Sequence, residues 1–409
     1  MTSVLRSRIR PNRAVGEDAR PSITGPSTGH PADTSPGLAC RGPTSLSATF
    51  GPCVRVEATR SRSVGCGAFG PARCDSVLLS GHAIARRRTG VKAVVFDRYG
   101  GPDVLRVVDV PVPSPAAGQV RLKVAATSVN LSDWEGLRGS PAYARIGGPR
   151  SRMRRTLGSD IAGVVEDVGE GVAEFRVGDE VYGDSLVMKG GFAEYAVVPQ
   201  AALARKPAEL TFAESSTIPQ SGAIALQGTA GVRPGARVLI NGAGGGSGTF
   251  AIQLAKRLGA HVTAVDNAAK QDFMTSVGAD EVVDFRRTDF TQTTEPYDLI
   301  LDMVAHRSVF AYRRALTPGG RYRCVGGSTR TLLRVLTVGA VAGRLTDRSI
   351  GVLAVNEGPG HFEPLADLCV RGEVRIYIDQ VFTLDEVPAA LARVGEGRAL
   401  GKVVVTLET

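Results

Sequence analysis

A glycine-rich segment carries the clearest chemistry in this sequence of 409 residues. Residues 241–248 read Asn-Gly-Ala-Gly-Gly-Gly-Ser-Gly. Their small residues have the spacing of a dinucleotide-binding loop, with alanine in the first glycine position. Such a loop turns tightly, lets the backbone approach a pyrophosphate, and ends in a helix whose free N–H groups attract phosphates. We therefore expect a cofactor to bind at Gly242, Ala243, Gly245, Gly246, Ser247 and Gly248.

An acidic residue follows at the distance that such a loop requires. Asp266 ends the predicted strand 261–266, which comes next after the loop. A carboxylate in this place accepts hydrogen bonds from the adenosine ribose and repels a 2′-phosphate, which favours NADH. Lys270, four residues later, would offset that repulsion, and Asp266 would alternatively cap the helix that starts at Ala268. Both NADPH and NADH stay open, with a lean to NADH.

Alternating strands and helices surround this loop and must position it. The predicted strands cover 236–241, 261–266, 281–284, 298–304, 320–325 and 349–355, and the predicted helices cover 247–258 and 268–277. This α/β alternation is typical of a doubly wound parallel sheet that is covered on both faces. Upstream, from Val91, short strands separated by glycines and prolines indicate an all-β unit.

We divide the chain into three regions on these patterns. Residues 1–90 form an Arg-rich extension that we expect to be disordered. Residues 91–217 form a substrate domain, which 357–409 complete, and 218–356 form the dinucleotide-binding domain. Because regular patterning begins abruptly at Val91, we expect the natural protein to start near there and the extension to be upstream sequence.

Charge and cysteine usage exclude several classes of protein. The first 90 residues hold 13 Arg and five acidic residues, so the remaining chain has a net charge of only +1. That balance argues against nucleic acid as a partner. The longest apolar run, 335–343, is far shorter than a membrane span. Only Cys324 and Cys369 lie beyond the extension, which favours a reducing compartment such as the cytoplasm.

Several stretches of the sequence resemble a known superfamily from Val91 to the C-terminus. They include "VKAVVFDRYGGPDVLRV", "LGSDIAGVVEDVGEGVAEFRVGDEVYG", "GGFAEYAVVP" and "VLINGAGGGSGTFAIQLAKRLGAHVTAV". The sequence resembles the medium-chain dehydrogenase/reductases, in particular the zinc-independent quinone oxidoreductases related to zeta-crystallin. The resemblance implies a GroES-like β-domain, an inserted Rossmann domain, and an active site between them. It also implies a homodimer or homotetramer with strand 349–355 near the interface.

The zinc-dependent members of this superfamily place metal ligands where the present chain has other residues. Asn130 stands near the position of a cysteine ligand, and Ser159 replaces a histidine. The region between Gly183 and Phe192 also lacks the four cysteines that such members carry there. Since a zinc site needs about three His, Cys or carboxylate ligands, we expect no zinc.

Without a Lewis acid, a nicotinamide cofactor suits an acceptor that is already electrophilic, such as a quinone or an α,β-unsaturated carbonyl. The resemblance gives catalytic roles to three residues. Asn130 would donate a hydrogen bond to the acceptor carbonyl, Asp133 would fix Asn130 or a water, and Trp134 would stack on a flat substrate. The alternative is that Asn130 and Asp133 cap a loop and that Trp134 belongs to the core.

Further cofactor contacts follow from the resemblance. Phe285 stands where relatives stack a tyrosine on adenine, and a second group would lie near the nicotinamide, namely Val325, Gly326, Gly327, Leu353 and Val355. Arg398 and Lys402 would reach phosphates or form a solvated pair of charges. We expect hydride transfer from NAD(P)H to a quinone or enone. The alternatives are a zinc-dependent alcohol or aldehyde dehydrogenase and a cofactor-binding protein without turnover.

Overall fold

The computed structural model describes residues 90–145, 155–186 and 188–407. Our interpretations of residues 1–89, as a disordered extension that precedes the natural start, lie outside the described residues. Within those ranges, no helix combines the length and the apolar character that crossing a membrane would demand.

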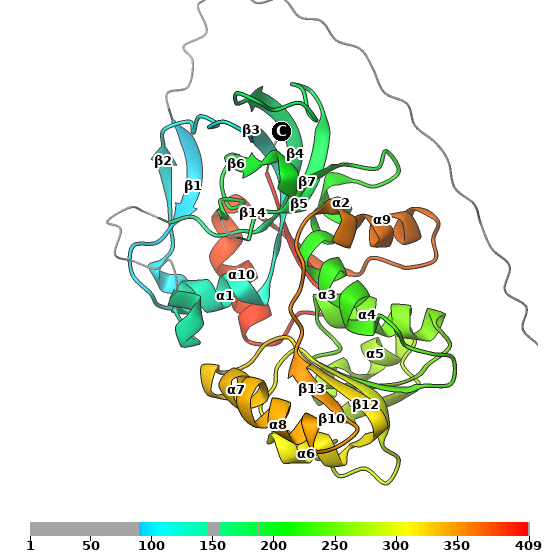
Figure 1. Ribbon diagram of the computed structural model, residues 1–409. Helices are drawn as coiled ribbons and strands as arrows, with labels where there is room; N and C mark the ends of the chain where they lie inside the picture. Colours follow the sequence, from blue (N-terminus) through cyan, green and yellow to red (C-terminus); the bar gives the residue numbers. More distant parts are fainter. Residues whose placement is uncertain (1–89, 146–154, 187, 408–409) are drawn as a thin grey trace, which may run out of the picture. The chain divides into compact units, whose positions relative to one another are not determined.

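The second half of the described chain builds a six-stranded sheet in which every neighbouring pair is parallel (Figure 1). In spatial order the strands are β10 (Glu281–Asp284), β9 (His261–Asp266), β8 (Arg237–Asn241), β11 (Tyr297–Asp302), β12 (Leu316–Cys324) and β13 (Ser349–Val352). The strand order reverses between β8 and β11, and ligands of such sheets bind at the carboxyl ends of the strands at that point. The predicted doubly wound parallel sheet is confirmed.

Helices cover both faces of this sheet because its strands are apolar on both sides. Val238 and Ile240 of β8 belong to one buried cluster, while Leu239 between them belongs to another. This alternation follows from the two-residue period of a strand. Among the helices of this part are α3 (Pro219–Thr229), α4 (Gly246–Arg257), α5 (Gln271–Val277) and α6 (Val309–Arg314), and α9 (Glu363–Val370) packs against α3.

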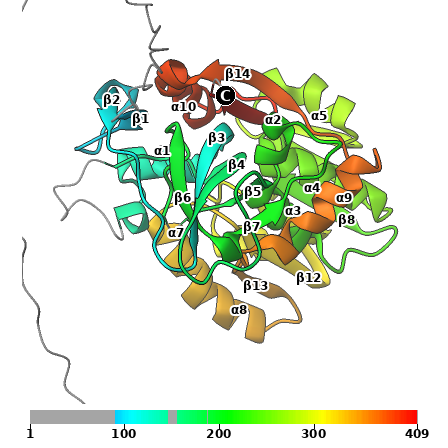
Figure 2. The ribbon, with the colours of Figure 1, turned by 90° about the horizontal axis from the view of Figure 1, so that it is seen from above.

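A seven-stranded, mainly antiparallel sheet forms the other part, and Figure 2 shows several of its strands side by side. Its strands are β3 (Gln119–Val129), β4 (Asp160–Val168), β5 (Glu180–Asp184), β6 (Tyr195–Pro199), β7 (Leu203–Arg205), β14 (Ile378–Thr383) and β15 (Lys402–Thr406). The C-terminal β15 pairs with β3, so a strand from the end of the described chain completes this sheet. A separate hairpin joins β1 (Val91–Val95) and β2 (Arg106–Val110).

Several helices escaped the sequence patterns. Helix α1 (Leu131–Arg138) packs against α10 (Val387–Gly395), and Figure 1 shows red α10 beside cyan α1. Helix α2 (Phe212–Ser216) is not among them, because the spacing of Thr211 and Glu214 predicts the capping box at which this helix begins. The apolar run 335–343 is helical as well, since a π-helical turn joins α7 (Thr329–Arg334) to α8 (Ala340–Arg344).

Candidate active site

The glycine-rich loop joins β8 to α4, as the sequence predicts. Gly242 has a φ of 84°, which favours glycine, and its N–H donates to the carbonyl of Val265 at 2.9 Å. Gly245 is extended and caps α4, whose first hydrogen bond runs from the N–H of Thr249 to the carbonyl of Gly245 at 3.0 Å. The amides of the first helical turn precede that bond, so they are available to an anion.

Three glycines of the loop, Gly244, Gly246 and Gly248, have no room for a side chain. A Cβ on Gly248 would lie 2.5 Å from the backbone of Ala243, so glycine permits the close packing of α4 on β8. A Cβ on Gly246 would lie 2.4 Å from Cδ of Lys402. Gly245 is different, because a Cβ there would meet only the carbonyl of Gly242 at 3.5 Å. The loop therefore leaves space beside Gly245, where a pyrophosphate would approach.

Asp266 and Lys270 form a buried ion pair beside this loop. The Asp266 carboxylate accepts hydrogen bonds from the Gly244 N–H at 3.1 Å and from the Lys270 ammonium at 3.2 Å. Its other oxygen accepts from the N–H of Asn267 at 2.8 Å. Asp266 is 9% exposed and Lys270 5% exposed. The ammonium of Lys270 is thus bound to the carboxylate rather than displayed to solvent.

The other predicted cofactor residues lie near the carboxyl ends of the parallel strands. Phe285 follows β10 and has its ring edge to the ring of His306, with centroids 6.2 Å apart. Leu353 directly follows β13 and donates its N–H to the carbonyl of Cys324 at 2.8 Å. Val325, Gly326 and Gly327 follow β12, and Val355 lies two residues beyond Leu353. Sequence reasoning did not single out His306.

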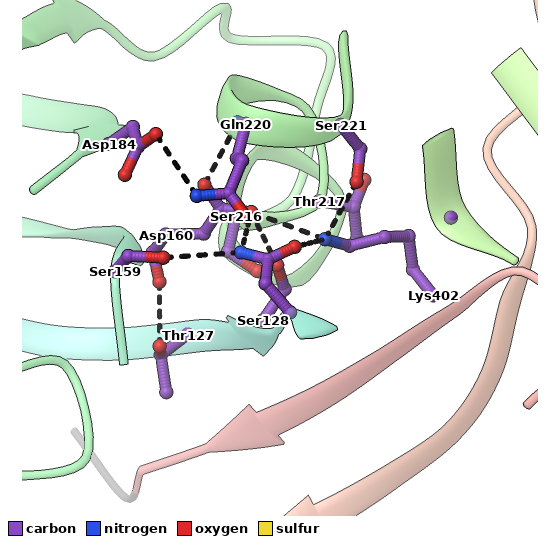
Figure 3. A network of polar contacts seen from close by, with 12 residues as sticks. Thr127, Ser128, Ser159, Asp160, Asp184, Ser216, Thr217, Gln220, Ser221 and Lys402 are labelled. Carbon is purple, nitrogen blue, oxygen red and sulfur yellow. Dashed lines mark hydrogen bonds and ion pairs between the residues drawn. The ribbon is translucent and has the colours of Figure 1, made fainter. Parts of the chain in front are cut away.

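Asn130 belongs to a buried polar network, of which Figure 3 shows Ser159, Asp160 and Lys402. Its amide nitrogen donates to Asp160 at 2.8 Å and to Ser159 at 3.3 Å, and its carbonyl oxygen accepts from Lys402 at 2.8 Å. Asp160 is fully buried and also accepts from the Ser128 hydroxyl at 2.9 Å. All the hydrogen-bonding groups of the Asn130 side chain are therefore engaged within the protein.

Lys402 supplies the positive charge at the centre of this network. Its ammonium donates to Asn130, to Asp160 at 3.2 Å and to Ser221 of α3 at 3.1 Å. These three acceptors match the three hydrogens of an ammonium, and the side chain is 2% exposed. The sequence offered only its nearness to the C-terminus, because residues 130, 160, 221 and 402 are far apart along the chain.

A second carboxylate, Asp184, flanks the network. It lies opposite Asp160 in the register of β4 with β5, and Gln220 lies between them. The Gln220 N–H donates to Asp160 at 3.0 Å, and its side-chain amide lies 3.5 Å from Asp184. Burial, reinforced by the negative charge of Asp160, holds the pKa of Asp184 well above its ordinary value.

Asp133 and Trp134 have surroundings that match the alternative roles considered from the sequence. The Asp133 carboxylate accepts from the N–H of Asn130 at 3.0 Å and from the N–H of Gly158 at 3.0 Å, so it fixes the start of α1. Trp134 packs on α10, where a Cβ on Gly395 would lie 2.0 Å from its ring. Arg138 stacks over the same ring at 5.2 Å. The catalytic roles of Asn130, Asp133 and Trp134 stay predictions.

The residues at the position of the superfamily's metal do not fit a zinc ion. Of the residues Asn130, Ser159 and Asp160, only Asp160 has a carboxylate, and this carboxylate already forms an ion pair with the Lys402 ammonium. An ammonium and a zinc ion would compete for the same oxygens, and zinc prefers about three Cys, His or carboxylate ligands. Within the part of the chain that the structure describes, no three His, Cys, Asp or Glu side chains gather as a metal site would.

Comparison with known families places the chain in one superfamily along most of its length. The model of the alcohol dehydrogenase GroES-like domain matches residues 116–208, and that of the zinc-binding dehydrogenases matches 277–405. The C-terminal domain of alanine dehydrogenase/PNT matches 209–305, which follows the first match and overlaps the start of the second. The predicted combination of a GroES-like domain and a Rossmann domain is confirmed.

Individual relatives agree with this placement. The chain is 31% identical over 329 residues to the chloroplastic quinone-oxidoreductase QR1 of Triphysaria versicolor, which covers 77% of this chain and 98% of the relative. It is 30% identical to the human mitochondrial NAD(P)H oxidoreductase RTN4IP1, over 78% of this chain and 90% of the relative. The solved quinone oxidoreductase of Coxiella burnetii superposes with a TM-score of 0.70 at 29% identity, covering 78% of this chain and all of the other.

Proposed function

Since the chain belongs to the medium-chain dehydrogenase/reductase superfamily and resembles its quinone oxidoreductases, we propose that it reduces a quinone or an α,β-unsaturated carbonyl with NAD(P)H and without zinc. The chain is an oxidoreductase with a nicotinamide cofactor and a small-molecule substrate. The identity of the acceptor, the choice between NADH and NADPH, and independence from zinc are the parts that we propose.

The observation that carries the proposal is the buried ammonium of Lys402 beside Asn130 and Asp160. It occupies the surroundings in which zinc-dependent relatives need a doubly charged metal. A quinone or an enone accepts hydride without the activation that a zinc ion gives to an alcohol or an aldehyde. The amide of Asn130 and the charge of Lys402 thus join side chains of the seven-stranded sheet to each other and to Ser221 of α3, which leaves neither group for a metal site.

The chain's own residues bind and orient the cofactor. Gly242, Ala243 and the residues Gly245–Gly248 would receive the pyrophosphate, with Ser247 in the first turn of α4. Residues 325–327, Leu353 and Val355 would hold the nicotinamide, and Phe285 would face the adenine. When bound, the reduced nicotinamide supplies the hydride.

We propose NADH as the preferred cofactor. The buried carboxylate of Asp266 would repel a 2′-phosphate, and the Lys270 ammonium, 3.2 Å away, is already paired with it. Accepting a phosphate there would require Lys270 to leave Asp266. The ribose hydroxyls of NADH need only a hydrogen-bond acceptor, which the same carboxylate supplies.

We also propose a homodimer or homotetramer that resides in the cytoplasm. Strand β13 is one of the two edge strands of the parallel sheet and pairs only with β12 within the described ranges. The edge of such a strand can pair with a second copy of the chain. The cytoplasmic location rests on the cysteine usage noted above.

The test is to follow oxidation of NADH and NADPH by the purified full-length protein, with a metal chelator present, against a panel of quinones and enones. We expect turnover in chelator, faster with NADH. Activity with alcohols that appears only after zinc is restored would assign the chain to the zinc-dependent dehydrogenases. Binding of both cofactors without turnover of any acceptor would favour a cofactor-binding protein.

A further inference from the structure

We propose that Glu135 is a further catalytic residue, which supplies the proton that the acceptor takes up after hydride transfer. This inference rests on the proposed function, because it concerns the same reaction. Glu135 lies on α1, and Tyr143 lies on the short 3₁₀ turn Ala142–Arg145 that follows. The Tyr143 hydroxyl is 3.2 Å from both carboxylate oxygens of Glu135. It is also 3.3 Å from the carbonyl oxygen of Gly327.

The contact with Gly327 brings this pair to the segment after β12, where we expect the nicotinamide to bind. Gly327 follows β12, and the carboxyl ends of such strands border the ligand. A second hydrogen bond ties the same segments together, since the N–H of Ala142 donates to the Thr329 hydroxyl at 3.1 Å. An acceptor that lies beside the nicotinamide would therefore meet Tyr143 and Glu135 from the side of α1.

Two other polar side chains of α1 and its start, Asn130 and Asp133, do not fill this proton-donating role. Both amide hydrogens of Asn130 point to protein acceptors, and both oxygens of Asp133 accept backbone N–H groups. Glu135 differs because its carboxylate is bonded to a hydroxyl, which can accept or donate as the proton moves. The Glu135–Tyr143 pair thus holds an exchangeable proton, and the Tyr143 hydroxyl of this pair lies beside Gly327.

The surroundings of Glu135 suit it to exchange a proton near neutral pH. Burial raises the pKa of Glu135 to about 6, while the hydrogen bond from Tyr143 and the positive charge of Lys189 act in the opposite direction. The Lys189 ammonium also faces Asp133, 3.7 Å away. On the Trp134 side of α1, helix α10 carries Arg393, which is paired with Asp379.

The tyrosine remains a neutral hydroxyl throughout. Burial and the neighbouring Glu135 carboxylate raise the pKa of Tyr143 above its ordinary value, and Cys324 of β12 acts in the same direction. Tyr143 can therefore relay a proton but does not release one to solvent by itself.

The proton balance of the step is simple. After hydride transfer the acceptor carries a negative charge on oxygen. The O–H bond of protonated Glu135 breaks and a new O–H bond forms on the acceptor, either directly or with the Tyr143 hydroxyl passing one proton on as it receives another. Glu135 is left as a carboxylate and regains a proton from water. The cofactor supplies the electron pair, so no further reductant is needed.

The test compares pH profiles of the full-length protein with NADH and an acceptor that the wild type reduces. We expect the wild-type kcat to fall as pH rises through about 6, since the donating form of Glu135 is protonated. Glu135→Gln should lower kcat at pH 6 by roughly 100-fold and remove this dependence. Tyr143→Phe should move the descending limb to higher pH, because it deletes a hydrogen bond that lowers the pKa of Glu135.

The chain contains a matched control pair. The exposed Tyr195 hydroxyl donates to Glu166 at 3.0 Å, and we expect Glu166→Gln and Tyr195→Phe to leave the profile unchanged. Carboxyl ¹³C NMR gives a readout without turnover, in which one signal titrates near pH 6 and disappears in Glu135→Gln. If the wild type reduces an acceptor but its profile is flat and Glu135→Gln keeps full kcat, the role of Glu135 is refuted and the proposed function stands. If no acceptor is reduced, both are refuted.

Discussion

The charge balance of the buried network rests on one side chain, Lys402. Asp160 is completely buried and carries hydrogen bonds from Ser128 and Asn130 in addition to the contact with Lys402. A buried carboxylate that loses its only cationic partner in such a network is strongly destabilising, because the remaining hydrogen bonds do not replace the lost charge. Lys402 is therefore a positioning residue, which pairs with Asp160 and orients the side chain of Asn130.

We expect Lys402→Met to lower the free energy of unfolding by about 3–5 kcal/mol, as removal of one partner of a buried ion pair does. Urea denaturation measures this change. The matched control is Lys256→Met, because Lys256 contacts the partly exposed Asp280 at 2.7 Å. That variant should lose no more than about 1 kcal/mol. Equal losses in both variants would contradict a special role for Lys402.

Cofactor preference also belongs to single residues. Asp266→Ser removes the negative charge that faces a 2′-phosphate and releases Lys270. We expect the ratio of kcat/KM for NADPH to that for NADH to rise roughly tenfold or more, since a like-charge contact costs several kcal/mol. Asp280→Ser is the control. It removes a carboxylate from a second Asp–Lys pair, to which we assign no part in cofactor binding, and it should leave the ratio unchanged. A ratio unaffected by Asp266→Ser would mean that Asp266 merely caps its helix.

At the scale of elements, local rules predicted some segments well. Strands 261–266 and 281–284 have the bounds that the sequence indicated, because each is a short apolar run between clear breaks. Strand β12 was expected from Gly320 but begins at Leu316. Pro318 and Gly319 obscure its start, and the register of β12 with β11 shifts just there. Turn residues inside a strand thus hid a bulge from the sequence pattern.

Other elements depend on contacts that no local pattern contains. Helix α1 gains its position from Trp134 packing on α10, more than 250 residues later in the chain. The π-helical turn 335–339 buries only Val335 and Gly339 and exposes Leu336 and Val338. Such a segment has no clean apolar face, so the sequence showed an apolar run without showing a helix.

The phosphate loop can be tested through Gly248, where α4 packs closely on β8. A side chain on Gly248 would collide with the backbone of Gly242 and Ala243 at 2.5 Å, so α4 would have to move away from β8. We expect Gly248→Ala to cost about 1–3 kcal/mol of stability, as overpacking does, and to weaken NADH binding measured by calorimetry. Gly360→Ala is the control, since nothing lies within 4 Å of its Cβ position. Unchanged NADH affinity in Gly248→Ala would contradict the assigned role of the loop.

At the scale of the whole molecule, the site depends on the return of the chain. β15 pairs with β3 antiparallel, and this pairing brings Lys402 to Asn130. The N–H of Gly401 also donates to the carbonyl of Gly244 at 3.0 Å, so the last strand contacts the phosphate loop as well. The sequence predicted the loop, but its meeting with β15 is a property of topology. This is why the cofactor loop could be predicted from the sequence and the polar network could not.

The central claim is that this chain transfers hydride directly from the nicotinamide to an electrophilic acceptor without a metal. The most direct measurement uses NADH carrying deuterium on the transferred position of C4, an enone, and full-length protein treated with chelator. Carbon-bound deuterium does not exchange with water, so mass spectrometry of the product reads the transfer. We predict one deuterium on the reduced carbon of the product in the presence of chelator. A product without deuterium, or reduction that resumes only when zinc is added, would contradict the account.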